Sequence, residues 1–588
     1  MSNTLVNYTA TAGAPNPFSI PRLRDARRLT QGALALGLLG AWLARNDMSS
    51  DGISYLDLGA AVAQGHWSAL INGYWSPLYA AVLGGAFVLL RPSPFWEFSV
   101  AHLISFAAYV AALAAFRFFL AGLLGWLHAR GESGIPERSI SLVAYVLFLW
   151  TSLHVISLSW INPDMLVAAF TYLAVGCILR IAAEPYRLRW FLALGLALGF
   201  GYLTKSPFFL LSIVFLAVGV AAGGGIRNTW KGLAAATAVC GCLSGPYVFA
   251  ISRTAGHFTF GESSRLNWAW FVGDIPSYHW QGGDRFGTPV HPTRKLVQEP
   301  PVYEFAGPLV ATYAPWIDPS YWYAGIRWRL SWTGILRNLL ANFAQIWDIL
   351  ITQQPEWLMV SLALLLAVRG DGLSVGRAFW ILLIPSVLCC VMYAPVHVES
   401  RMLGPFITLF WCGVLTAVRV PDRSAPAIKW VGILCLAASF CGLLQLGTSF
   451  LGEVMERGPR HLLRPFDVTS NFEWQVAQSL KQEGLSAGDQ IAWIRPQPFT
   501  ARESYYWARL ARLRIIAEIP AGQESRFWSA PSGTRANVLQ TLARAGAKAL
   551  IATHIPATYT PDGAAHDGWR HVGKTNYYVY LLNAHESH

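Results

Sequence analysis

The chain has 588 residues, of which 54% are hydrophobic and only 13% are charged, and its mean hydropathy is +0.38. Because a soluble protein carries about 25% charged residues, this composition excludes a soluble enzyme and indicates a polytopic membrane protein. The formal net charge is +12, but the basic residues stand in short runs beside apolar segments. That pattern sets membrane topology and does not indicate a nucleic-acid partner.

The N-terminal region combines a polar stretch with a basic cluster. Residues 1–21 are rich in Pro, Ser, Thr and Asn, and we expect residues 1–28 to form a disordered cytoplasmic segment. Four arginines between residues 22 and 28 precede the apolar run 29–43, and no cleavage site of small residues follows it. This pattern predicts an uncleaved signal anchor with its N-terminus in the cytoplasm.

The segment 46–76 is a polar loop between the first two predicted spans, and it carries Asp51 and Asp57. About 30 residues is long for a connector, and carboxylates held at a membrane face are candidates for a functional site. Two structural alternatives stay open. Asp51 can be the N-cap of a helix that begins at Gly52, and Asp57 can lie on a solvated helix face.

Apolar segments predict about twelve or thirteen spans in a domain that covers residues 29–450. The segment 97–127 would measure about 45 Å as a helix, which is too long for one untilted span and is compatible with two short passes. An outer position for the loop 46–76 requires an even number of crossings there. The segment 336–351 is apolar but contains several polar residues, so we expect a helix that lies in the membrane interface. The other predicted spans are at residues 29–43, 77–90, 140–160, 165–183, 190–204, 207–222, 231–251, 356–368, 378–395, 402–418 and 428–450.

The loop 252–333 is polar and aromatic, and its aromatic density argues against disorder. Aromatic rings can stack on sugars, so we expect side chains of this loop and of the first loop to contact substrate. His279, Asp284 and His291 could be metal ligands, but their spacing is unspecific, and we expect ordinary polar residues and no metal or cofactor. The candidate contact residues are Tyr55, Trp268, Trp270, Tyr278 and Trp280.

Residues 451–588 change character, because helical segments alternate there with short apolar strands. This pattern predicts a small soluble α/β domain after the transmembrane bundle, and the fold is mainly α overall. The domain contains no glycine-rich nucleotide-binding motif. All eight cysteines fall in apolar runs, which predicts no disulfide framework.

Polar sites reach the same membrane face from separate spans. A carboxylate there can orient or deprotonate an acceptor hydroxyl, and Lys and Arg can neutralise a phosphate leaving group. Each residue also has a structural alternative: Asp164 can cap the span after Pro163, Lys205 can extend toward the lipid headgroups, and Glu399 can simply pair with Arg401. The candidates are Asp51, Asp57, Asp164, Lys205, His397, Glu399 and Arg401.

In order and in sidedness, these motifs resemble the GT-C superfamily of integral-membrane glycosyltransferases, and more closely its protein O-mannosyltransferase and lipid A aminoarabinose transferase branch. The segment Asp51-Gly52-Ile53-Ser54-Tyr55 is similar to the family's Asp-Glu-x-x-Tyr pattern, whose Asp is taken as catalytic. Gly52 replaces the second acid, which leaves Asp57 or Asp164 for that role. Thr204-Lys205 resembles a Thr-Lys pair that contacts the lipid phosphate, and His397 and Arg401 resemble late basic residues near it.

The resemblance implies an inverting glycosyltransferase at the outer face of a bacterial inner membrane, with the C-terminal domain outside. Its donor would be a polyprenyl-phosphate sugar within the membrane lipid, and its acceptor a hydroxyl of a protein, a lipid or a glycan. Asp51, Asp164 and Asp57 are then the catalytic candidates, and Lys205, Arg401 and His397 would bind the donor phosphate. Two other functions remain open: a transporter or flippase for lipid-linked sugars, and an envelope assembly protein that displays its C-terminal domain.

Overall fold

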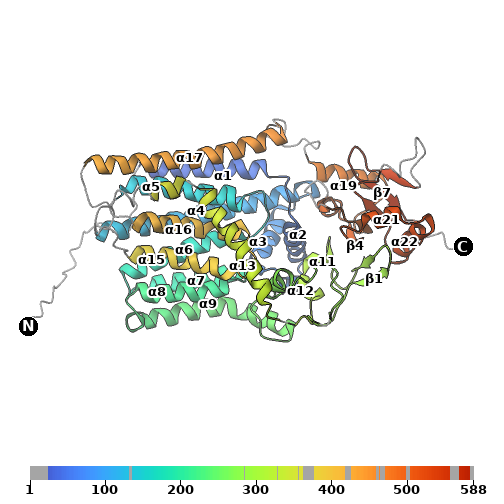
Figure 1. Cartoon of the computed structure of the whole chain (residues 1–588), viewed down its shortest axis with the longest axis horizontal. Coiled ribbons are helices and arrows are strands. Elements are labelled where there is room, and N and C mark those ends of the chain that lie inside the picture. The colour runs from blue at the N-terminus through green and yellow to red at the C-terminus, as the bar shows by residue number, and fades with distance from the viewer. Residues whose placement is uncertain are drawn as a thin grey trace, which may run out of the picture.

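The computed structural model describes residues 24–582 except 131–134, 284, 328, 355, 362–376, 418–424, 459–462, 464–470, 498–503 and 557–567. The chain forms a bundle of helices with a small α/β domain at one end (Figure 1). Of the segment 1–28 predicted to be disordered, residues 1–23 lie outside the described residues, whereas residues 24–28 begin the helix that continues into the apolar run, so the prediction is wrong there. Most of the predicted span 356–368 also lies outside the described residues.

The bundle consists of long apolar helices that run side by side (Figure 1). Among the described residues, five helical stretches are long and apolar enough to cross a membrane, and four shorter apolar helices accompany them. A helix that is hydrophobic on all sides must be buried in protein or lipid, and the molecule is accordingly a multi-pass membrane protein. The bundle helices are α1 (Arg24–Leu43), α4 (Glu97–Arg130), α5 (Glu137–Trp150), α6 (Asp164–Ala183), α7 (Leu188–Thr204), α8 (Phe208–Ala222), α9 (Ile226–Ala255), α15 (Arg377–Tyr393), α16 (Ser400–Ala417) and α17 (Ala425–Arg457).

The prediction of two short passes within 97–127 is wrong, because α4 is one continuous helix of 34 residues. The outer position of the loop 46–76 depended on that prediction, and it still agrees with the structure, because α3 (Pro77–Leu90), which was predicted as a span, does not cross the membrane. Ser76, directly before α3, lines the cavity described below, and Glu97, seven residues after the end of α3, is bonded to Arg509 of the α/β domain. Both ends of α3 therefore lie at the same end of the bundle. The single crossing by α4 replaces the three crossings predicted between residues 77 and 127. Both numbers are odd, so the sides assigned to the later loops do not change.

Helix α2 (Ser50–Ala63) packs against α3 at this end of the bundle. Close approach requires glycine, because a Cβ atom on Gly84 would lie 2.6 Å from Val62 Cγ1 and 2.9 Å from the carbonyl oxygen of Gly59. The α2–α3 pair thus forms a layer between the bundle and the α/β domain (Figure 1).

The α/β domain contains a seven-stranded sheet of order β1-β2-β4-β3-β5-β7-β6. Strands β3, β4 and β5 are parallel and the other pairs are antiparallel. The predicted alternation of helix and strand is confirmed. Its elements are α19 (Phe472–Gln482), β3 (Gln490–Ile494), α20 (Tyr506–Ala511), β4 (Arg514–Ile519), α21 (Glu524–Ser529), α22 (Ser532–Arg544), β5 (Ala549–Ala552), β6 (Trp569–His571) and β7 (Tyr578–Leu581).

Strands β1 (Arg294–Val297) and β2 (Val302–Glu304) come from the loop 252–333 and extend the same sheet, because β2 pairs with β4 and β1 pairs with β2. The period of two along β3 divides its side chains between two cores. Trp493 joins the cluster that contains α2 and the aromatic loop, whereas Ala492 and Ile494 face α21 and α22. The loop and the C-terminal domain therefore form one folded unit.

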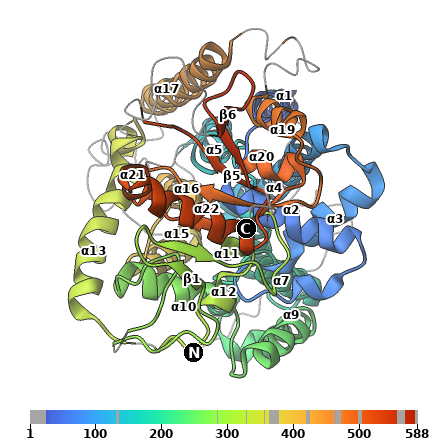
Figure 2. The same cartoon turned by 90° about the vertical axis from the view of Figure 1, so that its right-hand side faces the viewer.

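The rest of the loop is built of short helices, and the predicted interface segment forms a longer one. Helix α13 exposes Leu336, Leu340 and Phe343 and buries Asn338 and Asn342, as expected of a helix at a lipid surface. It lies at the edge of the molecule seen from the α/β end (Figure 2). The helices are α10 (Ser263–Asn267), the π-helical turn Trp268–Val272, α11 (Ala314–Ile317), α12 (Pro319–Trp322), α13 (Trp332–Trp347) and the π-helical turn Asp348–Thr352.

Candidate functional site

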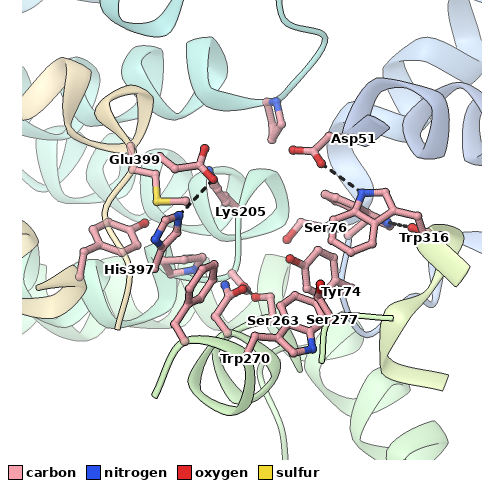
Figure 3. A pocket seen from close by; sticks show the side chains of 18 of the residues that line it. Asp51, Tyr74, Ser76, Lys205, Ser263, Trp270, Ser277, Trp316, His397 and Glu399 are labelled. Carbon is pink, nitrogen blue, oxygen red and sulfur yellow. Dashed lines mark hydrogen bonds and ion pairs between the residues drawn. The ribbon is translucent and has the colours of Figure 1, made fainter. Parts of the chain in front are cut away.

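A cavity of about 390 Å³ lies where the bundle meets the aromatic loop. Figure 3 shows Asp51 and Trp316 on one side of it, with Lys205, His397 and Glu399 on the other. The charged side chains and the aromatic rings thus face a common space. The aromatic lining consists of Tyr55, Tyr74, Trp75, Trp270, Phe271, Tyr278, Trp316 and Tyr393.

Asp51 reaches the cavity from the first turn of α2. The N-cap is Ser49, whose hydroxyl accepts a hydrogen bond from the amide of Gly52 at 3.0 Å. The alternative in which Asp51 is the cap is therefore wrong, and its carboxylate is available for the cavity. It accepts hydrogen bonds from Trp316 Nε1 at 3.2 Å and from Arg401 Nη2 at 3.0 Å.

Arg401, at the start of α16, joins carboxylates from three parts of the chain. Its guanidinium lies 3.0 Å from Asp51, 3.4 Å from Asp164 and 2.5 Å from Glu399. A guanidinium presents five N–H donors in a planar fork, so it can hold several oxygen acceptors at once. The expected pairing of Glu399 with Arg401 is present, and it is one part of a larger network.

Asp164 and Lys205 complete this network. Asn162 Oδ1 accepts a hydrogen bond from the amide of Asp164 at 2.9 Å and so orients the first turn of α6. Lys205 follows α7 in an extended conformation, and its Nζ lies 2.5 Å from Asp164 Oδ1. Only 3% of the Asp164 side chain is exposed, and it lies behind the two cations, whereas Lys205 and Arg401 line the cavity.

His397 and Glu399 stand on the loop between α15 and α16. The ring of His397 stacks on Phe271 with 4.0 Å between centroids, and its Nε2 lies 3.4 Å from Glu399 Oε1. Burial opposes ionisation of Glu399, but the hydrogen bond with His397 and the charge and hydrogen bond of Arg401 outweigh it and hold the pKa of Glu399 well below the usual range. Glu399 is therefore an anion at the edge of the cavity.

Asp57 does not line the cavity. Its carboxylate lies 2.7 Å from Arg509 Nη1 and accepts hydrogen bonds at 2.9 Å from the amide and hydroxyl of Thr312. Six residues at 3.6 per turn bring Asp57 about 240° around α2 from Asp51, so the two carboxylates leave different faces of the helix. Asp57 joins α2 to the α/β domain.

The predicted sugar-contacting residues separate into two groups. Tyr55, Trp270 and Tyr278 line the cavity. Trp268 instead donates to the carbonyl of Arg329, and Trp280 is buried in a stack on Tyr323 with 5.5 Å between centroids. Two further lining residues, Tyr74 and Trp75, were not among the candidates. The turn-prone aromatic segment of the first loop in which they lie is the signal that could have identified them. Trp316 had no such signal, since it is one of many aromatic residues in its loop.

The two suggested metal ligands that the structure describes have other partners. His279 bonds to Glu518 of the α/β domain, His291 stacks on Tyr321, and Asp284 lies outside the described residues. Within the described ranges, no group of three or more His, Cys, Asp or Glu side chains could hold a metal ion.

The family model of dolichyl-phosphate-mannose-protein mannosyltransferases matches residues 132–246. No curated protein matches the chain. The crystal structure of ArnT from Cupriavidus metallidurans bound to undecaprenyl phosphate superimposes with a TM-score of 0.50 and 12% identity, over 96% of this chain and 99% of that one. The apo state of the same protein gives a TM-score of 0.49 at 15% identity, over 95% of this chain and 99% of that one. The apo oligosaccharyltransferase of Archaeoglobus fulgidus gives a TM-score of 0.48 at 10% identity, over 90% of this chain and 70% of that one.

The likeness to the lipid-bound ArnT structure is one of fold. Together with the family model, it confirms the predicted resemblance to membrane glycosyltransferases of the GT-C type. The two findings support a membrane-embedded glycosyltransferase. A fold alone does not assign a donor or an acceptor, and that assignment depends on the residues of the cavity.

Proposed function

We propose that this protein transfers a sugar from a polyprenyl-phosphate carrier to an acceptor hydroxyl. The observation that carries the proposal is the network Asp51–Arg401–Asp164–Lys205, which gathers residues from α2, α6, α16 and the end of α7 at one cavity. Undecaprenyl phosphate in the ArnT structure of the same fold supports a lipid phosphate as the carrier.

Asp51 is assigned the role of activating the acceptor. Its carboxylate accepts the hydroxyl proton while the acceptor oxygen forms a bond to the anomeric carbon of the sugar. The bond from that carbon to the phosphate oxygen breaks, and its electron pair leaves with the polyprenyl phosphate. Attack from the side opposite the phosphate inverts the anomeric centre.

Lys205 and Arg401 are assigned to the donor phosphate. Charge accumulates on this phosphate as the glycosidic bond breaks, and two cations fixed in a partly buried site stabilise it without reorganisation. Asp164 holds both cations from behind. Arg401 already contacts three carboxylates, so phosphate that binds at its guanidinium exchanges with one of them. Glu399, on a loop with His397 beside it, is the carboxylate we assign to that exchange.

The aromatic lining is assigned to the sugar. Rings at the cavity wall can stack on the apolar face of a pyranose or furanose. Trp270 and Trp316 lie 5.8 Å apart between centroids, with an interplanar angle of 22°, and form a continuous surface.

We assign the cavity to the outer face of a bacterial inner membrane. Arg187 and Arg189 follow α6, and Arg227 and Lys231 follow α8, which places these basic groups at the end of the bundle opposite the cavity. Positive charges in short loops favour the cytoplasmic side. The α/β domain and the cavity then share the outer side, where lipid-linked sugars meet exported acceptors.

The test uses purified protein reconstituted in liposomes with a panel of radiolabelled polyprenyl-phosphate sugars and total membrane extract. We expect label to pass from one donor to an acceptor, with release of polyprenyl phosphate. Binding of a donor without transfer to any acceptor, combined with movement of the lipid-linked sugar between leaflets, would contradict the proposal and favour a flippase.

A further inference from the structure

A buried charged cluster outside the cavity connects the α/β domain to the aromatic loop. Glu518 on β4 is fully buried, and its Oε1 lies 2.7 Å from His279 Nε2. Its Oε2 accepts a hydrogen bond at 2.9 Å from the hydroxyl of Tyr313, and Arg495 Nη1 lies 3.9 Å from Oε1. Burial opposes ionisation of Glu518, but the bonds and charges of these three partners outweigh it and lower its pKa.

Arg495 extends this cluster toward the cavity. It directly follows β3, and its guanidinium carbon lies 3.9 Å from the centroid of the Tyr278 ring. Tyr278 lines the cavity and stacks with Trp316 at 5.5 Å between centroids. Trp316 in turn donates its indole N–H to Asp51. The contacts therefore run without a break from the central strands of the α/β domain to the carboxylate at the cavity wall.

We propose that Arg495 is a positioning residue for Asp51, acting through Tyr278 and Trp316. This inference deepens the proposed function and depends on the role assigned to Asp51 there. It gives the α/β domain a part in the reaction, although none of the charged residues that line the cavity belongs to that domain among the described residues.

Arg495 can position Asp51 by restricting the movement of the two rings between them. A guanidinium over an aromatic ring is attracted by the negative face of that ring, and here it is itself anchored near a carboxylate on the centre of a sheet. The ring then restricts where the indole of Trp316 can lie, and the indole N–H fixes one oxygen of Asp51 while Arg401 fixes the other. Reactive groups must be held to within a fraction of an ångström, and supporting residues achieve this.

A purely structural role for Arg495 makes different predictions. If Arg495 only stabilised the loop, its loss would lower thermal stability and would affect donor binding and turnover together. A positioning role requires a loss of kcat at nearly constant donor KM, because Lys205 and Arg401 contact neither Arg495 nor Tyr278 in the described network.

The test is Arg495→Met in the full chain, with Arg526→Met as its matched control. Arg526 is another arginine of the α/β domain that pairs with the loop. Its Nη1 lies 3.2 Å from Glu299 Oε2, but this pair is exposed. We expect Arg495→Met to lower kcat about tenfold or more with donor KM within about twofold, and Arg495→Lys to recover most of the loss. Unchanged kcat, or a loss that appears only in KM, would overturn the inference.

A second measurement does not require turnover. Modification of Asp51 by a water-soluble carbodiimide, followed by mass spectrometry, reports how firmly the carboxylate is covered. We expect its rate to rise about threefold or more in Arg495→Met and to stay unchanged in Arg526→Met. If wild type transfers no sugar, the proposed function fails, and an unchanged labelling rate would overturn the positioning role separately. If Arg495→Met does not fold, Arg495→Gln, which keeps a planar polar group, carries the same expectations.

Discussion

Arg401 is the residue on which the geometry of the candidate site most depends. It contacts Asp51, Asp164 and Glu399 at once, and Asp164 in turn holds Lys205. A lysine carries the same charge, but its ammonium is a point donor on a flexible stem and cannot span three carboxylates. The shape of the guanidinium is therefore as important here as its charge.

We predict that Arg401→Lys lowers kcat/KM for the lipid-linked donor by a factor of about 100, because the cation remains while the planar contacts are lost. The measurement is steady-state transfer from a radiolabelled donor. Arg526→Lys, at an exposed pair in the α/β domain, is the control and should retain wild-type activity. Equal activity of Arg401→Lys and wild type would show that only charge is needed.

Glu473 on α19 allows a prediction about pH. Burial raises its pKa to about 7, and hydrogen bonding from the Ser504 hydroxyl opposes this only in part. The unfolded chain ionises this group at a lower pH than the folded chain, so stability falls as pH rises from about 4.5 to about 7. Glu473→Gln removes this loss while keeping an oxygen acceptor for Ser504.

We therefore predict that Glu473→Gln stabilises the protein at pH 8 by as much as about 3 kcal/mol and has little effect at pH 5. Thermal unfolding in detergent at the two pH values is the measurement. A stabilisation that is equal at both values, or a destabilisation at pH 8, would contradict the raised pKa.

At the scale of elements, α13 anchors the loop that carries His397 and Glu399. Asn338 Nδ2 donates to the carbonyls of Phe271 and Val396, at 2.9 and 3.1 Å. Asn342 Nδ2 donates to the carbonyl of Ala394 at 2.9 Å, and its Oδ1 accepts from the amide of Val398 at 3.3 Å. The apolar face of α13 is exposed, so one helix contacts lipid on one side and the cavity loop on the other.

We predict that Asn342→Leu destabilises the protein by about 1–3 kcal/mol, because it leaves a buried carbonyl and a buried amide without their partner. Donor KM should rise several-fold as the loop loosens. Thermal unfolding and transfer kinetics are the measurements. Gln345→Leu, the same type of change at an exposed position of α13, is the matched control, and an equal effect of both would contradict the anchoring role.

Element-level features were predictable where they are local. Helix α19, strands β3, β4, β5 and β7 and the helical segment at 336–347 follow from period and composition within a dozen residues. Comparing segment length with membrane thickness gave a wrong prediction for α4, because a helix longer than the hydrocarbon layer can continue into the polar region instead of folding back. Strands β1 and β2 were not predicted, because they have only four and three residues and join the sheet through the pairing of β2 with β4, far along the chain.

At the scale of the whole molecule, the α/β domain is fixed to the bundle by buried ion pairs as well as by the shared sheet. Arg509 lies 2.7 Å from Asp57 and 2.8 Å from Glu97, and Arg512 lies 2.6 Å from Glu97. These contacts join α20 to α2 and to the start of α4. The domain therefore has a fixed position relative to α2, the helix that carries Asp51.

We predict that Arg509→Met costs about 3–5 kcal/mol, since it leaves the buried Asp57 without its cation and leaves Glu97 with Arg512 alone. The measurements are thermal unfolding and the rate of proteolysis between α17 and α19. Arg512→Met is the control: its side chain is 40% exposed, and we expect a clearly smaller loss. Equal stability of Arg509→Met and wild type would show that the sheet alone fixes the domain.

The charged part of the site was predictable in outline, because topology places the ends of successive spans at one membrane face. Topology places Asp51, Asp164, Lys205 and Arg401 on the same side of the membrane, and the structure brings these four residues into one network. Topology alone could not show that Asp57 lies outside this network, because the side of the membrane does not determine which face of a helix a residue occupies. Trp316 could not be predicted either, because its place depends on a loop that shares a sheet and a core with the α/β domain.

The most direct measurement compares sugar transfer by wild type and Asp51→Asn, with Asp274→Asn, an exposed carboxylate of the loop, as the control. We expect Asp51→Asn to lose two to four orders of magnitude in transfer, about the contribution of a general base, while donor binding and thermal unfolding stay close to wild type. Asp274→Asn should transfer normally. Full activity of Asp51→Asn would contradict the account, because no carboxylate would then be needed at the position where α2 meets the cavity.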